Sequence, residues 1–166
     1  MNSVARACLV FAFLALLLGG APRSPAAAVL PGPTLLTAAG EGAFPTGASL
    51  NGVDLRGGTF GQGVAVFADG SARGDFQTLL VGTNVLGAAT KILVVGWVTG
   101  GALNADGSVT VNGIASVDMR DGTLPSTGIP FSAVVTSAGF QLTVGATVLP
   151  TLLKNAGWIA IEQPQL

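Results

Sequence analysis

Carboxylates are the residues of this chain best suited to chemistry, because histidine is absent and Cys8 is the only cysteine. Glu41, Asp75 and Glu162 fall on different predicted strands, so a closed sheet would have to bring two of them together for acid–base catalysis. Asp75 shares a strand face with Arg73, which favours a surface ion pair as the simpler interpretation. Carboxylate catalysis stays a hypothesis, and no catalytic residue is assigned.

The chain offers even fewer residues for metal binding or nucleophilic catalysis than for carboxylate catalysis. Zinc, iron and copper sites, and Ser–His–Asp or Cys–His nucleophiles, are built from His or Cys. The segment 104–108 (Asn-Ala-Asp-Gly-Ser) invites a calcium interpretation. Aligning Gly107 with the invariant glycine of a calcium loop, however, puts Ala102 first and Gly113 last, and neither supplies a side-chain ligand. The sequence predicts a turn there, no metal and no cofactor.

Two further patterns have ordinary structural interpretations. Asp118, Arg120 and Asp121 cluster at a predicted hairpin end, where a solvated, charged turn is the commoner arrangement and a cation or polar ligand the rarer one. The glycine-rich stretch 57–63 leads into a strand, carries no lysine and opens no helix, so it is no phosphate-binding loop. Its glycines indicate a bulge or bend in a sheet.

The N-terminal residues 1–28 have the organisation of a signal peptide. Arg6 precedes an unbroken apolar run at 9–18, and Ala26-Ala27-Ala28 supplies small residues for cleavage before Val29. The run is shorter than the roughly 20 residues of a membrane span. Cys8 precedes the run, which argues against a lipoprotein. The mature chain is therefore expected to be secreted or periplasmic, without a membrane span, after export across a bacterial-type membrane.

Charge is sparse in the predicted mature chain. Cleavage removes Arg6 and Arg23, which leaves five basic residues against eight acidic ones. This balance excludes the basic face of a nucleic-acid-binding domain and a polybasic membrane patch. Cys8 is also removed, so the fold is expected to need no disulfide and to be stabilised by its core alone.

Short strands separated by turns dominate the remaining chain. Residues 29–34 are a predicted flexible lead-in, 35–162 a single β-domain, and 163–166 a tail. Asp69-Gly70 predicts a two-residue type I′ turn between strands 59–68 and 71–81. The stretch 45–58 is expected to be a loop. Further strands are predicted at 35–44, 91–98, 108–119, 130–136, 140–148 and 157–162.

The fold class is thus all-β: a single antiparallel meander of seven to eight strands, small and barrel-like, with a two-sheet β-sandwich as the alternative. Alternation places one residue of every two in the core, as with Phe76 in strand 71–81 and Phe140 in strand 140–148. Strand 91–98 is apolar on both faces, so it is expected to be covered on both sides or to lie in the middle of the sheet.

Three aromatic residues are candidate ligand contacts. Core packing is the simpler interpretation of Trp97. The sharper one is that Phe76, Trp97 and Phe140 line an apolar cavity, because small barrels can hold one small ligand.

A set of short turn and packing segments carries a resemblance to a known kind of domain: Thr59-Phe60, Phe67-Ala68-Asp69-Gly70-Ser71, Gly74-Asp75-Phe76, 107–113 (Gly-Ser-Val-Thr-Val-Asn-Gly), Pro130-Phe131 and Gly157-Trp158-Ile159. Through these segments, residues 40–161 resemble a family of small secreted bacterial β-domains that are uncharacterised and are sometimes attached to anchor-type or repeat-rich extracellular proteins. The resemblance implies an antiparallel barrel-like fold and carries over no catalytic or ligand residues.

Three functional hypotheses follow. The favoured one is an exported, non-catalytic β-domain that binds an extracellular or envelope surface component or a small apolar ligand. The second is a structural, self-associating envelope or surface component, suggested by the apolar outer face of strand 91–98. The third is a barrel enzyme of the cyclase or isomerase kind without a metal, in which one carboxylate or a water completes the chemistry.

Overall fold

The computed structural model describes residues 32–164, all of them in strands, turns and short connections. The predicted signal peptide at 1–28 lies outside the described residues. The long strands are β1 (Thr34–Ala43), β3 (Val53–Val66), β4 (Ser71–Asn84), β5 (Ala89–Leu103), β6 (Val109–Asp118), β7 (Ser126–Thr136), β8 (Gly139–Val144) and β10 (Leu152–Glu162), and β2 (Ser49–Leu50) and β9 (Thr147–Val148) are short.

These strands form one ring of antiparallel hydrogen bonds. The sheet runs in the order β1-β10-β8-β7-β6-β5-β4-β3-β2, and β1 also pairs with β3. Every consecutive long pair from β3 to β8 is antiparallel, so the all-β, meandering, barrel-like fold is confirmed. The ring removes most exposed strand edges.

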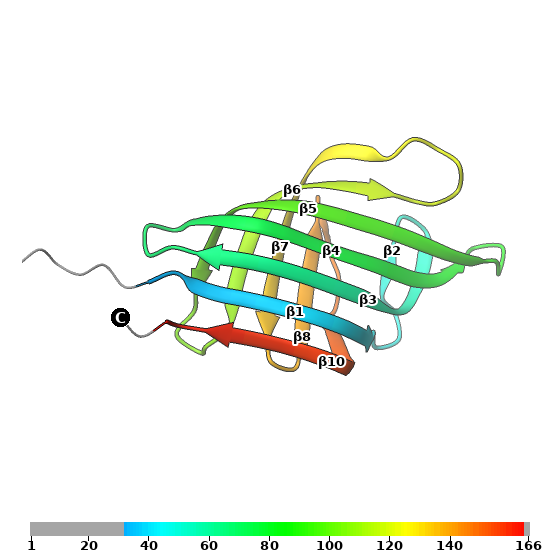
Figure 1. Ribbon diagram of the computed structural model, residues 1–166. Helices are drawn as coiled ribbons and strands as arrows, with labels where there is room; N and C mark the ends of the chain where they lie inside the picture. The colour runs from blue at the N-terminus through cyan, green and yellow to red at the C-terminus, as the bar shows by residue number, and fades with distance from the viewer. Residues whose placement is uncertain (1–31, 165–166) are drawn as a thin grey trace, which may run out of the picture.

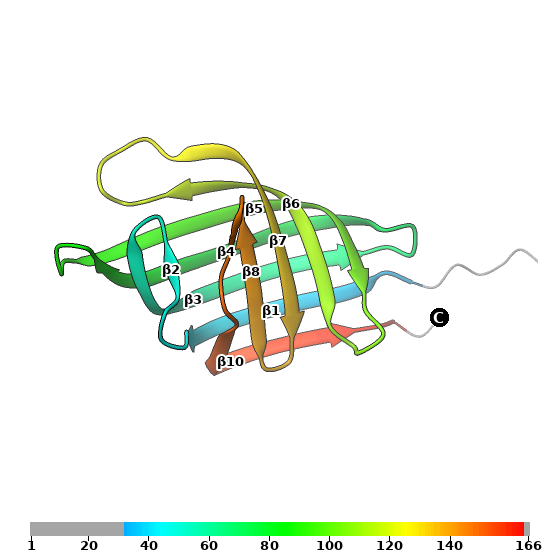
Figure 2. The same cartoon turned by 180° about the vertical axis from the view of Figure 1, so that it is seen from behind.

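The ring is flattened into two layers whose strands cross steeply. Figure 1 shows β10, β1, β3, β4 and β5 side by side across the front, and Figure 2 shows β6, β7 and β8 running over the back. Strands β8 and β10 are paired over a short length only, at Leu152 with Phe140 and at Leu153 with Gly139. The Lys154 N–H also donates to the Ala138 carbonyl, at 2.8 Å.

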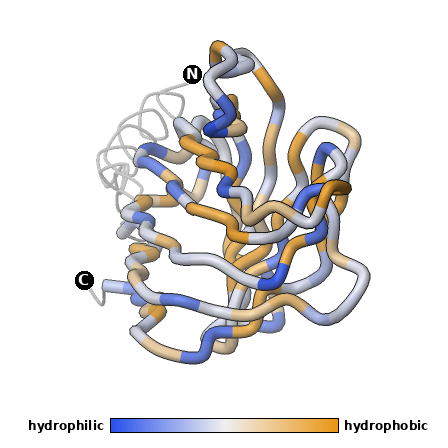
Figure 3. Tube along the Cα trace, turned by 90° about the vertical axis from the view of Figure 1, so that its right-hand side faces the viewer, coloured by the Kyte–Doolittle hydropathy of each residue, from blue (hydrophilic) through white to orange (hydrophobic). Residues whose placement is uncertain are grey.

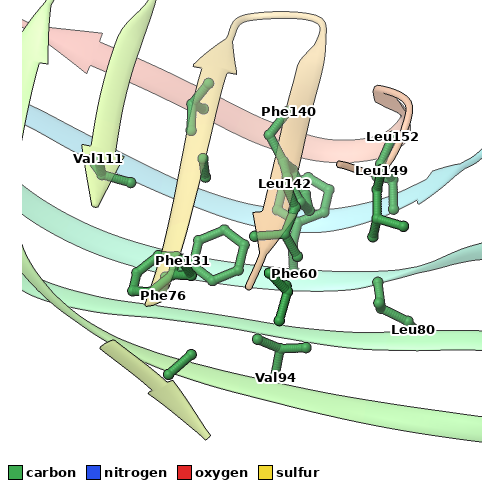
Figure 4. Close-up of a cluster of buried hydrophobic side chains, with 14 of the residues drawn as sticks. Phe60, Phe76, Leu80, Val94, Val111, Phe131, Phe140, Leu142, Leu149 and Leu152 are labelled. Atoms are coloured by element: carbon green, nitrogen blue, oxygen red, sulfur yellow. The ribbon is translucent and has the colours of Figure 1, made fainter. Parts of the chain in front are cut away.

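Aliphatic and phenyl side chains from both layers fill the space between them (Figure 4). Phe76 lies 5.4 Å from Phe140 and 5.6 Å from Phe131, centroid to centroid, and Phe60 lies 5.4 Å from Phe140. Gly96 makes room for this cluster, because a Cβ there would come within 2.6 Å of the Phe131 ring. The alternation of apolar and polar residues therefore predicted the core-facing residues of β4, β7 and β8 correctly.

Several strand boundaries were predicted wrongly. The expected loop 45–58 contains β2 and the first residues of β3, and β10 begins at Leu152, five residues before the prediction. Position 57 of β3 requires glycine because β1 lies close to it: a Cβ there would lie 2.3 Å from the Gly42 carbonyl oxygen. Strand 140–148 is two strands, because the chain turns back at Gly145, whose φ is 58°.

The predicted type I′ turn at Asp69-Gly70 was also wrong. Phe67 and Ser71 form the closing pair, and the Gly70 N–H donates to the Phe67 carbonyl, at 3.0 Å. Gly70 has a positive φ of 83°, whereas Asp69 is not among the residues with positive φ, and a type I′ turn requires two of them in succession. The hairpin therefore has a three-residue loop.

Candidate functional site

The three predicted ligand contacts do not share one surface. Phe76 and Phe140 are 0 % exposed inside the ring, and a side chain without accessible surface borders no void that a water molecule can enter. Trp97 is 61 % exposed, so core packing was the wrong interpretation for it. It lies on the outer face of β5, opposite Ile114 of β6, because Ile92, Val94 and Val98 take the inner face.

Gln62 is the chemically unusual residue of the interior. It lies on the inner face of β3, between Ala38 of β1 and Phe76 of β4. Gln62 is 6 % exposed, and within residues 32–164 neither its amide nitrogen nor its amide oxygen has a hydrogen-bond partner. An unpaired buried polar group destabilises a fold by about 1–3 kcal/mol. Gln62 is thus an inward-facing polar side chain whose amide makes no hydrogen bond that stabilises the fold.

The carboxylates considered for acid–base chemistry are exposed and separated. Glu41, Asp75 and Glu162 all lie at exposed positions of their strands. Glu41 is paired with Ala156 of β10, six residues before Glu162 on that strand, and Asp75 lies on β4. The structure therefore brings no two of these three carboxylates together.

The charged cluster at the β6–β7 connection is held by its own turn. Arg120 and Asp118 form an ion pair of 3.5 Å, and the Arg120 N–H donates to the Asp118 carboxylate. The Thr123 hydroxyl and N–H donate to Asp121, and these two hydrogen bonds, of which the hydroxyl's has the larger effect, lower the pKa of Asp121. A shallow open depression lies here, lined by Asp118, Arg120, Gly122 and Thr123.

The segment 104–108 forms a hairpin turn. The Ser108 hydroxyl and N–H both donate to Asp106, and the Asn104 amide donates to the Ser108 hydroxyl at 2.8 Å. Its polar atoms are therefore used within the turn. No group of three or more His, Cys, Asp or Glu residues suited to a metal ion is found within residues 32–164.

Three connections lie at the same end of the strands, and we call residues 44–52, 84–88 and 119–125 together the loop end. Figures 1 and 2 show the β4–β5 and β6–β7 connections reaching beyond the body of the sheet at this end. The Asn51 amide donates to the Met119 sulfur at 3.6 Å, which joins two of the connections. Asn51 and Arg120 both have left-handed backbone, with φ of 50° and 55°.

The loop end carries unusually exposed aliphatic side chains. Val85 and Leu86 are each 88 % exposed, and Leu124 is 92 % exposed. Figure 3 looks onto this end and shows hydrophobic stretches in orange among hydrophilic ones in blue. Single exposed apolar residues are common on protein surfaces, but near-complete exposure of three aliphatics on projecting loops is informative.

The β4–β5 turn does not require these aliphatics. The Asn84 side-chain oxygen accepts bonds from the N–H groups of Leu86 and Ala88, and the Gly87 N–H donates to the Asn84 carbonyl. Gly87 supplies the positive φ, at 82°. Val85 and Leu86 therefore stand at two positions where the backbone would accept polar residues.

Sequence reasoning missed this end of the molecule. The stretch 82–90 was expected to be a connection, with a short strand around Val85 as an option. A signal was nevertheless present, because no charged residue occurs from Thr78 to Thr90, and Val85-Leu86 stands between turn-forming Asn84 and Gly87. Turn positions favour Asp, Asn, Ser and Gly. An aliphatic pair at these positions therefore indicates a role outside the turn.

Comparison with known proteins returned no matching family model, no curated protein and no solved structure. Within residues 32–164 there is no helix of the length and apolar character that would cross a bilayer.

Proposed function

We propose that this chain is an exported, non-catalytic β-domain that binds a surface component of the cell envelope, and that this component is the lipid surface itself. The observation that carries the proposal is the near-complete exposure of Val85, Leu86 and Leu124 at the loop end. The apolar leader at 9–18 supports delivery to the envelope.

A lipid surface suits these residues better than a folded partner. The aliphatics stand on two separate projecting connections, and a bilayer accepts protruding apolar side chains without a matching pocket. Burying a Val or Leu side chain gains about 1.5–3 kcal/mol. Three of them supply roughly 5–9 kcal/mol before losses of translational freedom, which corresponds to weak, reversible binding.

Electrostatics contributes little to this mode of binding. No charge occurs from Thr78 to Thr90, and the β6–β7 connection carries Asp121 beside the paired Asp118 and Arg120. Attraction to anionic lipid needs clustered Lys and Arg. The proposed binding is therefore insensitive to salt and shows no preference for anionic over zwitterionic lipid.

Co-sedimentation with phosphatidylcholine vesicles tests the proposal. The test variant is V85A/L86D/L124S; its Ala-Asp pair is the one found at Ala68-Asp69 and Ala105-Asp106, so the hairpin backbone is kept. The matched control is Val148→Thr, which alters an apolar residue that is 62 % exposed on β9.

The wild-type protein and V148T are expected to sediment with vesicles equally, and the triple variant at least tenfold less. Wild-type protein that stays in the supernatant, or a triple variant that binds as well as the wild type, overturns the proposal. Binding that appears only when envelope proteins are reconstituted into the vesicles also overturns the lipid assignment, in favour of a protein receptor.

A further inference from the structure

Strand β10 has a partner along one side only for most of its length. Residues Ala156–Glu162 are in continuous register with β1, from Glu41 to Leu35. On the other side, β10 is paired with β8 only at Leu152 and Leu153 among the described residues. Figure 1 shows β10 as the lowest strand of the front layer. Every second residue of such an edge points its N–H and C=O away from the sheet.

The free edge lacks most features that protect edges from pairing. Between Lys154 and Glu162 there is no charged residue and no proline. Trp158 is 51 % exposed on the outer face, and Ile159 and Ile161 are only partly buried on the inner face. A register shift next to Asn155 distorts the start of the edge, and Gly157 has a positive φ of 90°, but the register with β1 is continuous from Ala156 onward.

We infer that a second copy of this chain pairs with this edge, so that the β10 strands of two molecules lie antiparallel. Charge selects both the partner and the direction. Lys154 precedes the free segment and Glu162 ends it, so antiparallel pairing brings each lysine end toward the other copy's glutamate end. Parallel pairing would instead bring the two Glu162 carboxylates together.

The resulting assembly has twofold symmetry, as most homodimers do. The two front layers, each of β10, β1, β3, β4 and β5, become one continuous sheet, and Trp158 lies within the new contact. This inference goes beyond the proposed lipid binding and is independent of it, because β10 contributes nothing to the loop end.

Sedimentation velocity across a concentration series tests the inference. The wild-type protein is expected to shift toward twice the chain mass as its concentration rises. Ala160→Lys places a charge on the outer face of the free edge and is expected to weaken association at least tenfold. Gln141→Lys is the matched control, since Gln141 is exposed on β8 of the back layer, and it is expected to associate as the wild type does.

Hydrogen exchange of the wild-type protein gives a second readout that needs no variant. The amides of 156–162 that point away from β1 are expected to become better protected as concentration rises, while those of the 104–108 hairpin are unchanged. A monomer at millimolar concentration, equal association of A160K and wild type, or protection of 156–162 that is independent of concentration would each overturn the inference. None of these results bears on vesicle binding.

Discussion

The hairpins at 67–71, 84–88 and 104–108 have the same backbone pattern and different side chains. In each, the first residue donates its N–H to the carbonyl of the fifth, and the glycine in fourth place donates back to the carbonyl of the first. The three glycines have φ of 83°, 82° and 82°. The second and third residues are Ala-Asp in two hairpins and Val-Leu in the one at the loop end.

The difference separates what the fold needs from what it does not. In the two Ala-Asp hairpins the carboxylate accepts hydrogen bonds from the following serine, and so stabilises the turn. In the third, Asn84 performs that role from the first position, and the aliphatic pair contacts solvent. Since the same backbone forms with polar residues twice, the exposed aliphatics at the loop end point to function.

The largest expected effect concerns the other residue that the fold does not use, Gln62. Gln62→Leu removes a buried amide without partners and is expected to raise the free energy of unfolding by about 1–3 kcal/mol, measured by urea denaturation. Vesicle binding is expected to be unchanged, which would leave the loop end as the site. A destabilised Q62L variant would show instead that the amide has a polar partner inside the ring.

Alanine substitution of the three turn glycines sharpens the comparison itself. Each glycine has positive φ, and an added Cβ would meet no atom within 4 Å, so the whole effect comes from backbone conformation. Gly70→Ala, Gly87→Ala and Gly107→Ala are each expected to lower the free energy of unfolding by about 1–2 kcal/mol. Clearly unequal losses would mean that the three backbones are not equivalent.

Exchanging the second and third hairpin residues, in both directions between Val-Leu and Ala-Asp, is expected to change the free energy of unfolding less. Val85→Ala with Leu86→Asp is expected to leave stability within about 0.5 kcal/mol of the wild type, as for most surface changes. Ala105→Val with Asp106→Leu removes the acceptor of two Ser108 hydrogen bonds and is expected to lower the free energy of unfolding more than the reverse exchange does. Equal losses in the two directions would show that Val85 and Leu86 do serve the fold.

Local pattern was enough to predict the core, and long-range register was not. Alternation in β4 and β7 located Phe76 and Phe131 because side-chain direction along a strand depends on adjacent residues alone. Alternation could not place Trp97, because strand 91–98 is apolar on both faces, and that pattern favoured the core. The register shift between β1 and β10, at Glu41/Gly42, and the short pairing of β8 with β10 are long-range features that no local pattern reveals.

The candidate site was harder to predict for a different reason. The stretch 82–90 was expected to be a connection, with a short strand around Val85 as an option. Only the exposed fraction of the Val85 side chain distinguishes an aliphatic at a projecting tip from one that folds back onto the sheet. Gln62 could have been found, because it falls between Phe60 and Val64 on the inner face of β3. Whether its amide finds a partner is a property of the assembled core.

The smallest expected effect is a difference in pH dependence between the hairpins. Asp69 accepts hydrogen bonds from Ser71, and Asp106 accepts them from Ser108. The bond from the serine hydroxyl has the larger effect and the bond from its N–H the smaller, and together they hold the pKa of each carboxyl below the usual range. A carboxyl whose folded-state pKa is lowered stabilises the fold above its unfolded pKa, which is roughly 3.9. That contribution is lost as the pH falls through the lower, folded-state value.

Exchange of the Ser71 and Ser108 amides should therefore quicken, relative to intrinsic rates, below about pH 4, whereas the Leu86 amide, held by Asn84, should not respond in this way. Asp69→Asn and Asp106→Asn are expected to abolish the acid response in their own hairpins. Carboxyl signals in an NMR titration that move at or above the usual Asp pKa would contradict the assignment of these bonds, and with it the claim that Ala-Asp stabilises two hairpins while Val-Leu leaves the third free to contact something else.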